Sequence, residues 1–77
     1  MEAQMTGEDI RRMRQEMGLE QIPFAYLIDT RQKDVSRWES GKVKPGPKYQ
    51  SRIQALYDSR DTIETQRRIA IAILDTL

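Results

Sequence analysis

Apolar residues recur every three or four positions along most of this 77-residue chain, and the alternation that is typical of β-strands is not found. The pattern predicts an all-α protein with five helices, separated by short and mostly polar stretches. The expected helices cover about residues 7–17, 21–28, 31–40, 47–57 and 62–77. A chain of this length can form one small domain with a thin hydrophobic core.

Several residues mark the ends of these helices. Thr6 followed by Asp9 has the spacing of a capping box, and Gly18 suits the left-handed residue that ends a helix. Pro23 lies in the first turn of the second helix, where a proline removes no helical hydrogen bond. Pro47 suits the first position of the fourth helix for the same reason. These signals support the boundaries that the apolar pattern predicts.

The third helix carries the most informative pattern in the chain. Residues 30–45 have the sequence TRQKDVSRWESGKVKP, in which Val35 and Trp38 form one apolar edge and Gly41 ends the helix. The rest of the helix surface carries long or polar side chains rich in hydrogen-bond donors: Gln32, Lys33, Ser36 and Arg37. We interpret this as a helix that uses one edge for folding and presents the other to a DNA groove.

Charge is distributed unevenly, although the net charge is only +1. Residues 31–52 contain seven Lys or Arg residues and two acidic residues, whereas residues 1–30 contain three Arg residues and six acidic residues. The basic block coincides with the third helix and the loop after it. We therefore expect a basic face suited to a nucleic acid rather than an ordinary solvated run of charge. Lys48 and Arg52 either extend this face or are merely solvated.

The last helix has more apolar residues than one neighbouring helix can cover. Its apolar positions at helical spacing, widened by Ile71 and Ala72, are Ile63, Ile69, Ala70, Ile73, Leu74 and Leu77. Two interpretations fit: a buried helix that completes the core, or a dimer interface. We favour the interface, because a helix that is apolar on several sides needs several neighbours. The expected interface residues are Ile69, Ile73, Leu74 and Leu77.

The composition excludes several kinds of chemistry. The chain has no Cys and no His, which removes thiol nucleophiles, disulfides, Cys/His zinc sites and the most common general base. We therefore expect no enzyme activity, no metal and no cofactor. The N-terminus does not resemble a signal peptide, and the longest apolar block, residues 69–74, is too short to cross a bilayer. The expected protein is soluble and cytoplasmic, without a membrane partner.

The second and third helices, joined by a short turn, have the spacing of a helix-turn-helix. Ala25 is small where the third helix must cross closely, and Val35 and Trp38, ten and thirteen residues later, hold that helix onto the first two. These three residues are expected in the core. The segment VSRWESGKVKP, preceded in register by IRRMR at residues 10–14 and GLEQ at residues 18–21, resembles the Cro/C1-type helix-turn-helix family of phage and bacterial regulators, also called the xenobiotic-response-element family.

The resemblance extends over residues 6–56 and implies a lambda-repressor-like fold. From the apolar pattern of the last helix, residues 58–77 are expected to form a C-terminal helix that completes the core and forms the dimer interface. The resemblance implies a DNA-binding domain over residues 1–57. It also implies that Gln21 contacts a phosphate at the start of the second helix. The outward residues of the recognition helix that it places at base edges, with Ser36 close by, are Gln32, Lys33 and Arg37.

Two further pairs are carried over from the resemblance. Lys42 and Lys44 match the loop that holds the DNA backbone in this family. Arg14 and Glu39 match a buried salt bridge between the first and third helices. Removing one partner of such a pair leaves the other charge uncompensated in the core. This salt bridge is therefore expected to stabilise the fold.

The sequence departs from the family pattern at four positions. Glu20 stands where Ser or Thr usually caps the second helix, and its charge would repel a nearby phosphate. Pro23 replaces a common Glu, and Asp29 replaces the common turn glycine, whose left-handed conformation Asp tolerates. Arg31 replaces a common Ser and is expected to add a phosphate contact.

These expectations combine into a homodimer that binds double-stranded DNA and represses transcription by occluding a promoter. The side chains expected on the DNA backbone are Gln21, Arg31, Lys42 and Lys44. Two alternatives remain open. One is the antitoxin of a toxin–antitoxin pair, with residues 62–77 contacting the toxin. The other is a protein-interaction module on the same fold that binds no DNA.

Overall fold

The computed structural model of the chain describes residues 5–77, which form five α-helices and no strand. The helices are α1 (Gly7–Glu16), α2 (Gln21–Leu27), α3 (Gln32–Glu39), α4 (Pro47–Asp58) and α5 (Ile63–Asp75). The prediction of an all-α protein with five helices is confirmed, and every helix end lies within two residues of the expected one. Within residues 5–77, no helix combines the length and the apolar character that a membrane span requires.

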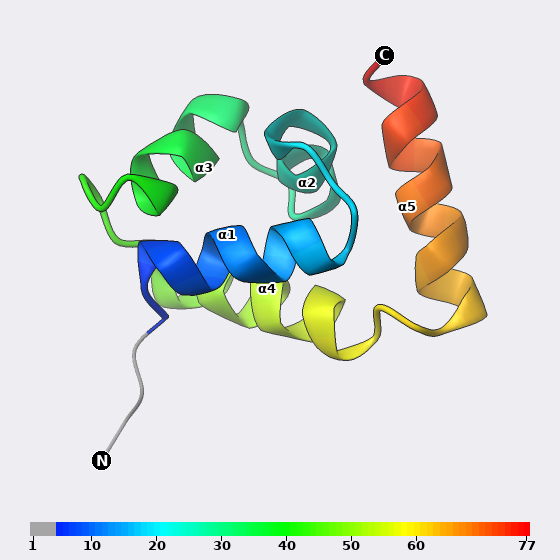
Figure 1. The fold of residues 1–77 in the computed structure, drawn as a ribbon, viewed down its shortest axis with the longest axis horizontal. Coiled ribbons are helices and arrows are strands. Elements are labelled where there is room, and N and C mark those ends of the chain that lie inside the picture. The colour runs from blue at the N-terminus through cyan, green and yellow to red at the C-terminus, as the bar shows by residue number, and fades with distance from the viewer. Residues whose placement is uncertain (1–4) are drawn as a thin grey trace.

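The helices are arranged around a small core, with α5 at one side (Figure 1). In this view α1 crosses the middle, α4 lies beneath and behind it, and α2 and α3 lie above it. Packing contacts join α2 to α3 and to α5, and join α1 to α3 and to α4. The helix-turn-helix formed by α2 and α3 therefore rests on α1, while α5 packs mainly against α2.

The core is built from apolar residues of all five helices. The three predicted core residues are buried in it: Ala25 is 2%, Val35 0% and Trp38 5% exposed. The remaining members of the cluster are Ile10, Met13, Leu19, Phe24, Ile28, Ile53, Leu56 and Ile69. The small side chain of Ala25 and the branched side chain of Val35 allow α2 and α3 to cross closely, so the orientation of α3 is fixed by packing.

Local signals account for the ends of α1 and for the turn of the helix-turn-helix. The Thr6 hydroxyl accepts a hydrogen bond from the Asp9 backbone N–H, and the Thr6 N–H donates to the Asp9 carboxylate, both at 3.0 Å. These two bonds form the predicted capping box. Asp29 has a φ of +61°, the left-handed conformation expected where the family pattern has glycine.

A close approach of two backbones fixes the start of α1 on the end of α3. A Cβ added at Gly7 would lie 2.7 Å from the Glu39 carbonyl oxygen and nearer still to that of Trp38. A larger residue at Gly7 would therefore push α1 away from α3. The absence of a side chain at this position is a requirement of packing rather than of backbone conformation.

The face that α5 turns to the core differs from the predicted apolar stripe. Its buried residues are Thr65, Ile69 and Ala72, while Ile63 is 74% exposed. Of the apolar positions named from the sequence, only Ile69 and Ala72 face the core, and the polar Thr65 takes the third buried position. Thr65 can lie inside because its hydroxyl shares a hydrogen bond of 2.8 Å with the Ser59 hydroxyl. Most of the predicted stripe consequently lies at the surface.

Candidate nucleic-acid interface

Helix α3 divides cleanly into a buried side and an exposed side. Val35, Trp38 and Glu39 are buried, and Trp38 also packs its ring against Tyr49, with 5.3 Å between the ring centroids. The exposed positions include all four residues predicted to read bases: Gln32, Lys33, Ser36 and Arg37. The helix is thus anchored through one side and offers amide, ammonium, hydroxyl and guanidinium groups on the other.

A buried ion pair holds the end of α3 against α1. Arg14 Nε donates to Glu39 Oε2 at 2.7 Å, and a terminal guanidinium nitrogen of Arg14 donates to Glu39 Oε1 at 2.9 Å. Another Arg14 nitrogen donates to the Leu19 carbonyl oxygen at 2.8 Å. The Glu39 side chain is 1% exposed. The structure therefore contains the bidentate pair that the resemblance implied.

The environment of Glu39 favours its charged form. Burial alone raises the pKa of this carboxyl, but hydrogen bonds from Arg14 and Gln21 and the charge of Arg14 outweigh that effect. The pKa of Glu39 consequently lies below its usual value. The hydrogen bonds between Arg14 and Glu39 also raise the pKa of Arg14, so both members of the pair remain charged around neutral pH.

Hydrogen bonds connect this buried pair to the exposed side of α3. Gln21 Nε2 donates to Glu39 Oε1 at 3.1 Å, and Gln32 Nε2 donates to Gln21 Oε1 at 3.3 Å. Gln21 and Gln32 are the first residues of α2 and α3. Gln21, which is predicted to contact a phosphate, and Gln32, which is predicted to contact a base, are therefore linked to each other and to the core.

Arg11 also belongs to this network and was missed in the sequence. Its Nε donates to Glu39 Oε1 at 3.4 Å, and its side chain is 52% exposed. The signal for it was the three-residue spacing from Arg14, which places two cations on one side of α1. Because it is half exposed, Arg11 adds positive charge to the surface beside Gln21.

The acidic residues near α3 differ in whether their side chains have local partners. Asp34 accepts a hydrogen bond of 2.7 Å from the Thr30 hydroxyl and lies 3.7 Å from Arg31 Nε. The Thr30 bond and the Arg31 charge lower the pKa of Asp34. Glu20 precedes α2, as expected, without a side-chain capping bond, and it is exposed. Glu20 is thus the acidic group left facing solvent beside the start of α2.

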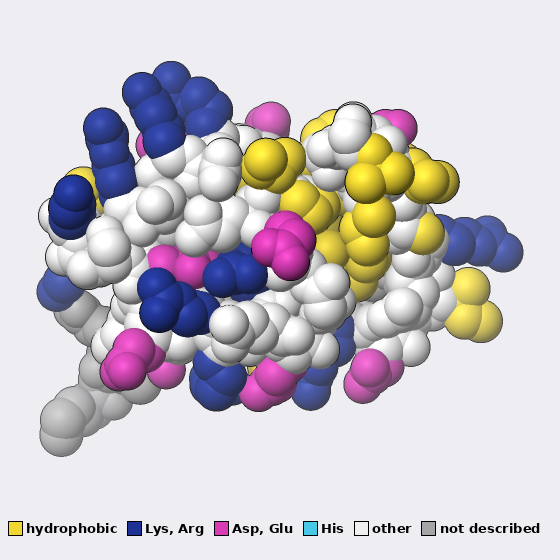
Figure 2. Space-filling model, turned by 45° about the horizontal axis from the view of Figure 1, so that its top comes forward, with side chains coloured by type: hydrophobic (Ala, Val, Ile, Leu, Met, Phe, Trp, Pro, Cys, Tyr) yellow, Lys and Arg dark blue, Asp and Glu magenta, His cyan; other side chains and the backbone are white. Residues whose placement is uncertain are grey.

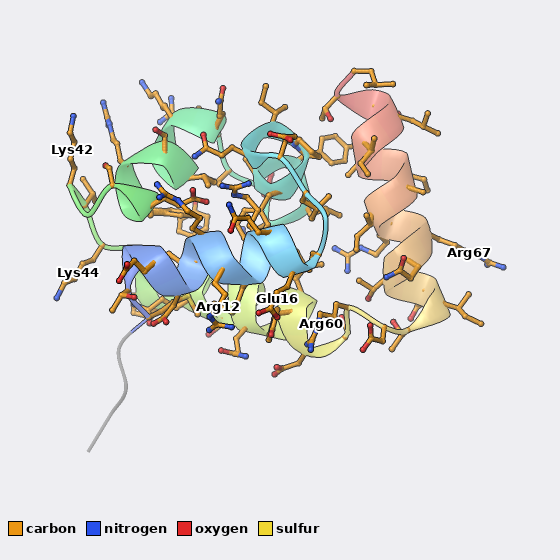
Figure 3. The ribbon with its side chains drawn as sticks, in the orientation of Figure 1. Arg12, Glu16, Lys42, Lys44, Arg60 and Arg67 are labelled. Carbon is orange, nitrogen blue, oxygen red and sulfur yellow. The ribbon has the colours of Figure 1, made fainter. Side chains whose placement is uncertain are left out.

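The residues predicted to contact the DNA backbone do not all point the same way. Arg31 is exposed at the start of α3, and Gln21 is half-buried beside it. Lys42 and Lys44 leave the following loop on different sides, Lys42 toward the side of α3 and Lys44 away from it (Figure 3). The structure therefore groups Gln21, Arg31 and Lys42 with the exposed side of α3 and sets Lys44 apart.

The structure also distinguishes the two residues for which the sequence left alternatives. Arg52 donates to the Ile28 carbonyl oxygen at 3.1 Å and lies 3.9 Å from Asp29, so it supports the end of α2. Lys48 is exposed, with its ammonium group 5.1 Å from the centroid of the Tyr49 ring. Arg52 thus has a structural role in the helix-turn-helix.

A second surface lies at the other end of the molecule, where hydrophobic side chains gather while Lys and Arg side chains cluster at the α3 end (Figure 2). Leu74 is 68% exposed elsewhere on α5, whereas Ile73, 38% exposed, and Leu77, 95% exposed, line this surface. Ile69 does not, because it is 7% exposed and packs in the core. The assignment of Ile69 to an interface is therefore corrected.

Helix α2 contributes to the same apolar surface. Ile22 is 47% exposed and, with Pro23, lines a groove of about 280 Å³ against the end of α5. Tyr26 also joins α2 to α5, because its hydroxyl donates a hydrogen bond to an Asp75 carboxylate oxygen at 2.8 Å. The sequence did not reveal this participation, because it depends on how α5 lies against α2.

Comparison of this chain with protein-family models, curated proteins and solved structures found no significant match in any of the three. Within residues 5–77, no group of three or more acidic, His or Cys side chains is placed to hold a metal ion.

Proposed function

We propose that this protein binds specific sequences of duplex DNA as a homodimer, with α3 in the major groove. The observation that carries the proposal is the division of α3. Its buried side fixes the helix, while four side chains with hydrogen-bonding groups remain exposed on the other: Gln32, Lys33, Ser36 and Arg37. A major groove admits an α-helix and presents base edges to such groups.

The proposed roles follow from the chemistry of each side chain. Arg37 and Lys33 donate hydrogen bonds and suit the two acceptors of guanine, while Gln32 both donates and accepts and suits adenine. The hydroxyl of Ser36 can serve either kind of base edge. We assign specificity to these four residues.

Backbone binding is assigned to the cations and the amide that surround α3. Gln21, Arg31 and Lys42 lie on its side of the molecule, while Lys44 contributes charge from the other side of the loop. Arg11 joins them. Its half-exposed guanidinium and the Gln21 amide both contact Glu39 Oε1, so the two side chains lie close together. Phosphate contacts of this kind supply affinity that depends strongly on salt and carry no sequence information.

The apolar surface on α2 and α5 supports the homodimer. Ile22, Ile73 and Leu77, which line it together, are all more than a third exposed. Fully burying one such side chain contributes about 1.5–3 kcal/mol. A two-fold partner that covers this surface would present two copies of α3 to half-sites about one turn of DNA apart, roughly 34 Å. A repressor that occludes a promoter is the simplest regulatory use of such a dimer.

The test is selection of bound sequences from a random pool of duplex DNA, with the affinity then measured against salt concentration. The expected result is a palindromic consensus and a steep salt slope, to which each neutralised phosphate contributes about 0.9. Retention without a consensus would overturn the base-reading roles. No retention at low salt would favour the protein-interaction module that binds no DNA. Stoichiometric recovery of another protein, with DNA binding retained, would favour the antitoxin.

A matched pair of triple variants sharpens this test. Replacing Gln32, Lys33 and Arg37 with Ala should abolish the consensus, because exposed helix positions tolerate Ala without loss of fold. The control replaces Gln15, Arg67 and Arg68, which are exposed on α1 and α5, and removes the same amide and the same charge. The control should retain the consensus. Equal loss in both variants would show that net charge alone governs binding.

A further inference from the structure

A small cavity lies between the start of α1 and the loop that follows α3. Its volume is about 240 Å³, and its apolar lining comes from Met5, Trp38, Val43 and Pro45. Lys44, which points away from the exposed side of α3, lines the same cavity (Figure 3). The cavity is therefore separate from the surface that is proposed to bind DNA.

Packing and hydrogen bonds hold the walls of this cavity in place. Trp38 is 5% exposed and packs its ring against Tyr49. The Val43 N–H donates to the Arg37 carbonyl oxygen at 3.4 Å, and the Gly41 N–H donates to the Trp38 carbonyl oxygen at 3.1 Å. The loop is thus fastened to the end of α3, and the cavity is part of the fold before any ligand binds, as ligand sites usually are.

One hydrogen-bond donor of the lining has no partner. The indole N–H of Trp38 donates no hydrogen bond within residues 5–77, although a buried tryptophan N–H usually finds an acceptor. No fully buried side-chain nitrogen or oxygen in this part of the chain lacks a partner. The indole nitrogen must therefore be among the few atoms of Trp38 that remain exposed. Trp38 thus adds one open donor to an otherwise apolar wall.

The lining defines the chemistry of a ligand. An apolar body would cover Met5, Val43 and Pro45, and one oxygen acceptor would pair with the indole N–H. Pockets that hold drug-sized molecules measure about 300–1,000 Å³, so this cavity suits a smaller molecule, such as one ring with a short substituent. The lining has no acidic residue, and its charged residue, Lys44, already has an interaction of its own. A neutral ligand fits these features.

We propose that this cavity binds a small neutral molecule with an apolar body and one carbonyl oxygen, which accepts a hydrogen bond from the Trp38 indole N–H. The proposal goes beyond DNA binding and does not depend on it. A bound molecule would bridge the start of α1 and the loop after α3, and it would supply the acceptor that the indole lacks within the protein.

The first test is a titration with acetophenone, an aromatic ketone with this chemistry, followed by proton–nitrogen NMR spectra. Trp38 is the single tryptophan of the chain, so the spectrum contains one indole signal. This signal and the backbone signals of Gly41 and Val43 should shift together and reach saturation. Signals from the far end of α5 should stay in place. A linear shift without saturation would overturn the proposal.

The second test isolates the hydrogen bond. Ethylbenzene has the shape of acetophenone without the oxygen, so the ratio of the two affinities reports what the oxygen contributes. Trp38→Phe keeps an aromatic ring and removes the donor, and it should lower the acetophenone-to-ethylbenzene ratio about fivefold, the equivalent of one neutral hydrogen bond. Affinities are measured from the backbone signals of Gly41 and Val43. An unchanged ratio in the folded variant would overturn the role of the indole N–H.

The third test fills the cavity and decides the proposal even if Trp38→Phe does not fold. Val43→Phe enlarges a side chain that is 49% exposed, so it should fold normally and lose the saturable shift of the indole signal. The control Ile71→Phe adds the same ring at a 53% exposed position of α5 and should bind acetophenone like the wild-type protein. Unchanged binding by Val43→Phe would place acetophenone elsewhere and overturn the site. DNA selection tests the proposed function separately, so either proposal can fail alone.

Discussion

Helices α3 and α5 both lie at the surface, but they leave opposite kinds of side chain exposed. The exposed side of α3 is polar, and the first of its side chains is tied to the core through Gln21 and Glu39. The exposed sides of α5 are apolar, with Leu74 68% and Leu77 95% exposed. Water solvates the first surface at no cost, whereas the second gains free energy only when it is covered. Under the proposed function, the surface of α3 needs its partner for function, and the surface of α5 needs its partner for stability.

The largest expected effect comes from removing the anchor of α3. Glu39→Ala leaves the buried Arg14 guanidinium without its partner and should lower the free energy of unfolding by about 3–5 kcal/mol. Urea denaturation followed by circular dichroism measures this loss. The control Glu8→Ala removes an exposed carboxylate of α1 and should change stability little. A midpoint equal to that of the wild-type protein would show that the pair does not hold α3.

The apolar surface of α5 is tested next. Leu77→Glu places a charge in the proposed interface and should weaken dimerisation by about 1.5–3 kcal/mol per protomer, the contribution of the lost apolar side chain. Analytical ultracentrifugation over a range of concentrations measures the dissociation constant. Ile63→Glu is the matched control, because Ile63 is 74% exposed at the opposite end of the same helix. Equal weakening by both variants would place the interface elsewhere on α5.

The polar surface of α3 is tested by separating base reading from backbone binding. Arg37→Ala should cost about 1–3 kcal/mol of binding free energy and relax specificity at one position. Lys42→Ala should weaken binding to all sequences alike and lower the salt slope by about 1. Titrations of the selected operator and of a scrambled duplex distinguish the two patterns. The assignment of Arg37 fails if its replacement leaves operator affinity unchanged.

The smallest expected effect is the change in folding stability with pH. The pKa of Glu39 in the folded protein lies below its ordinary value of 4.5, so folding favours the charged carboxylate. The resulting stabilisation is fully present above the ordinary pKa and is lost as the pH falls through the folded-state pKa. Comparing urea midpoints at neutral and at low pH should show a smaller acid loss in Glu39→Gln than in the wild-type protein. An equal loss would assign the acid sensitivity to other carboxylates, such as Asp9 and Asp34.

The sequence alone determined the features that depend on neighbours along the chain. The five helices and the capping box at Thr6 follow from residues within four positions of each other. The left-handed turn at Asp29 was expected from the glycine of the family pattern. The division of α3 into a buried edge and an exposed side follows equally from its own period, through Val35 and Trp38. The pairing of Arg14 with Glu39 could be predicted only because the whole motif resembles a known family.

The tertiary structure decided what depends on contacts between distant segments. Periodicity cannot say which side of α5 meets α2, so the burial of Ile69 and the exposure of Ile63 emerged only when the helices were packed. The links from Glu39 to Gln21 and from Gln21 to Gln32 join residues 18 and 11 positions apart. Their donor and acceptor directions are set by a carboxylate that only folding buries. Local sequence thus determined which groups the protein offers, and packing determined where they point and which of them are already occupied.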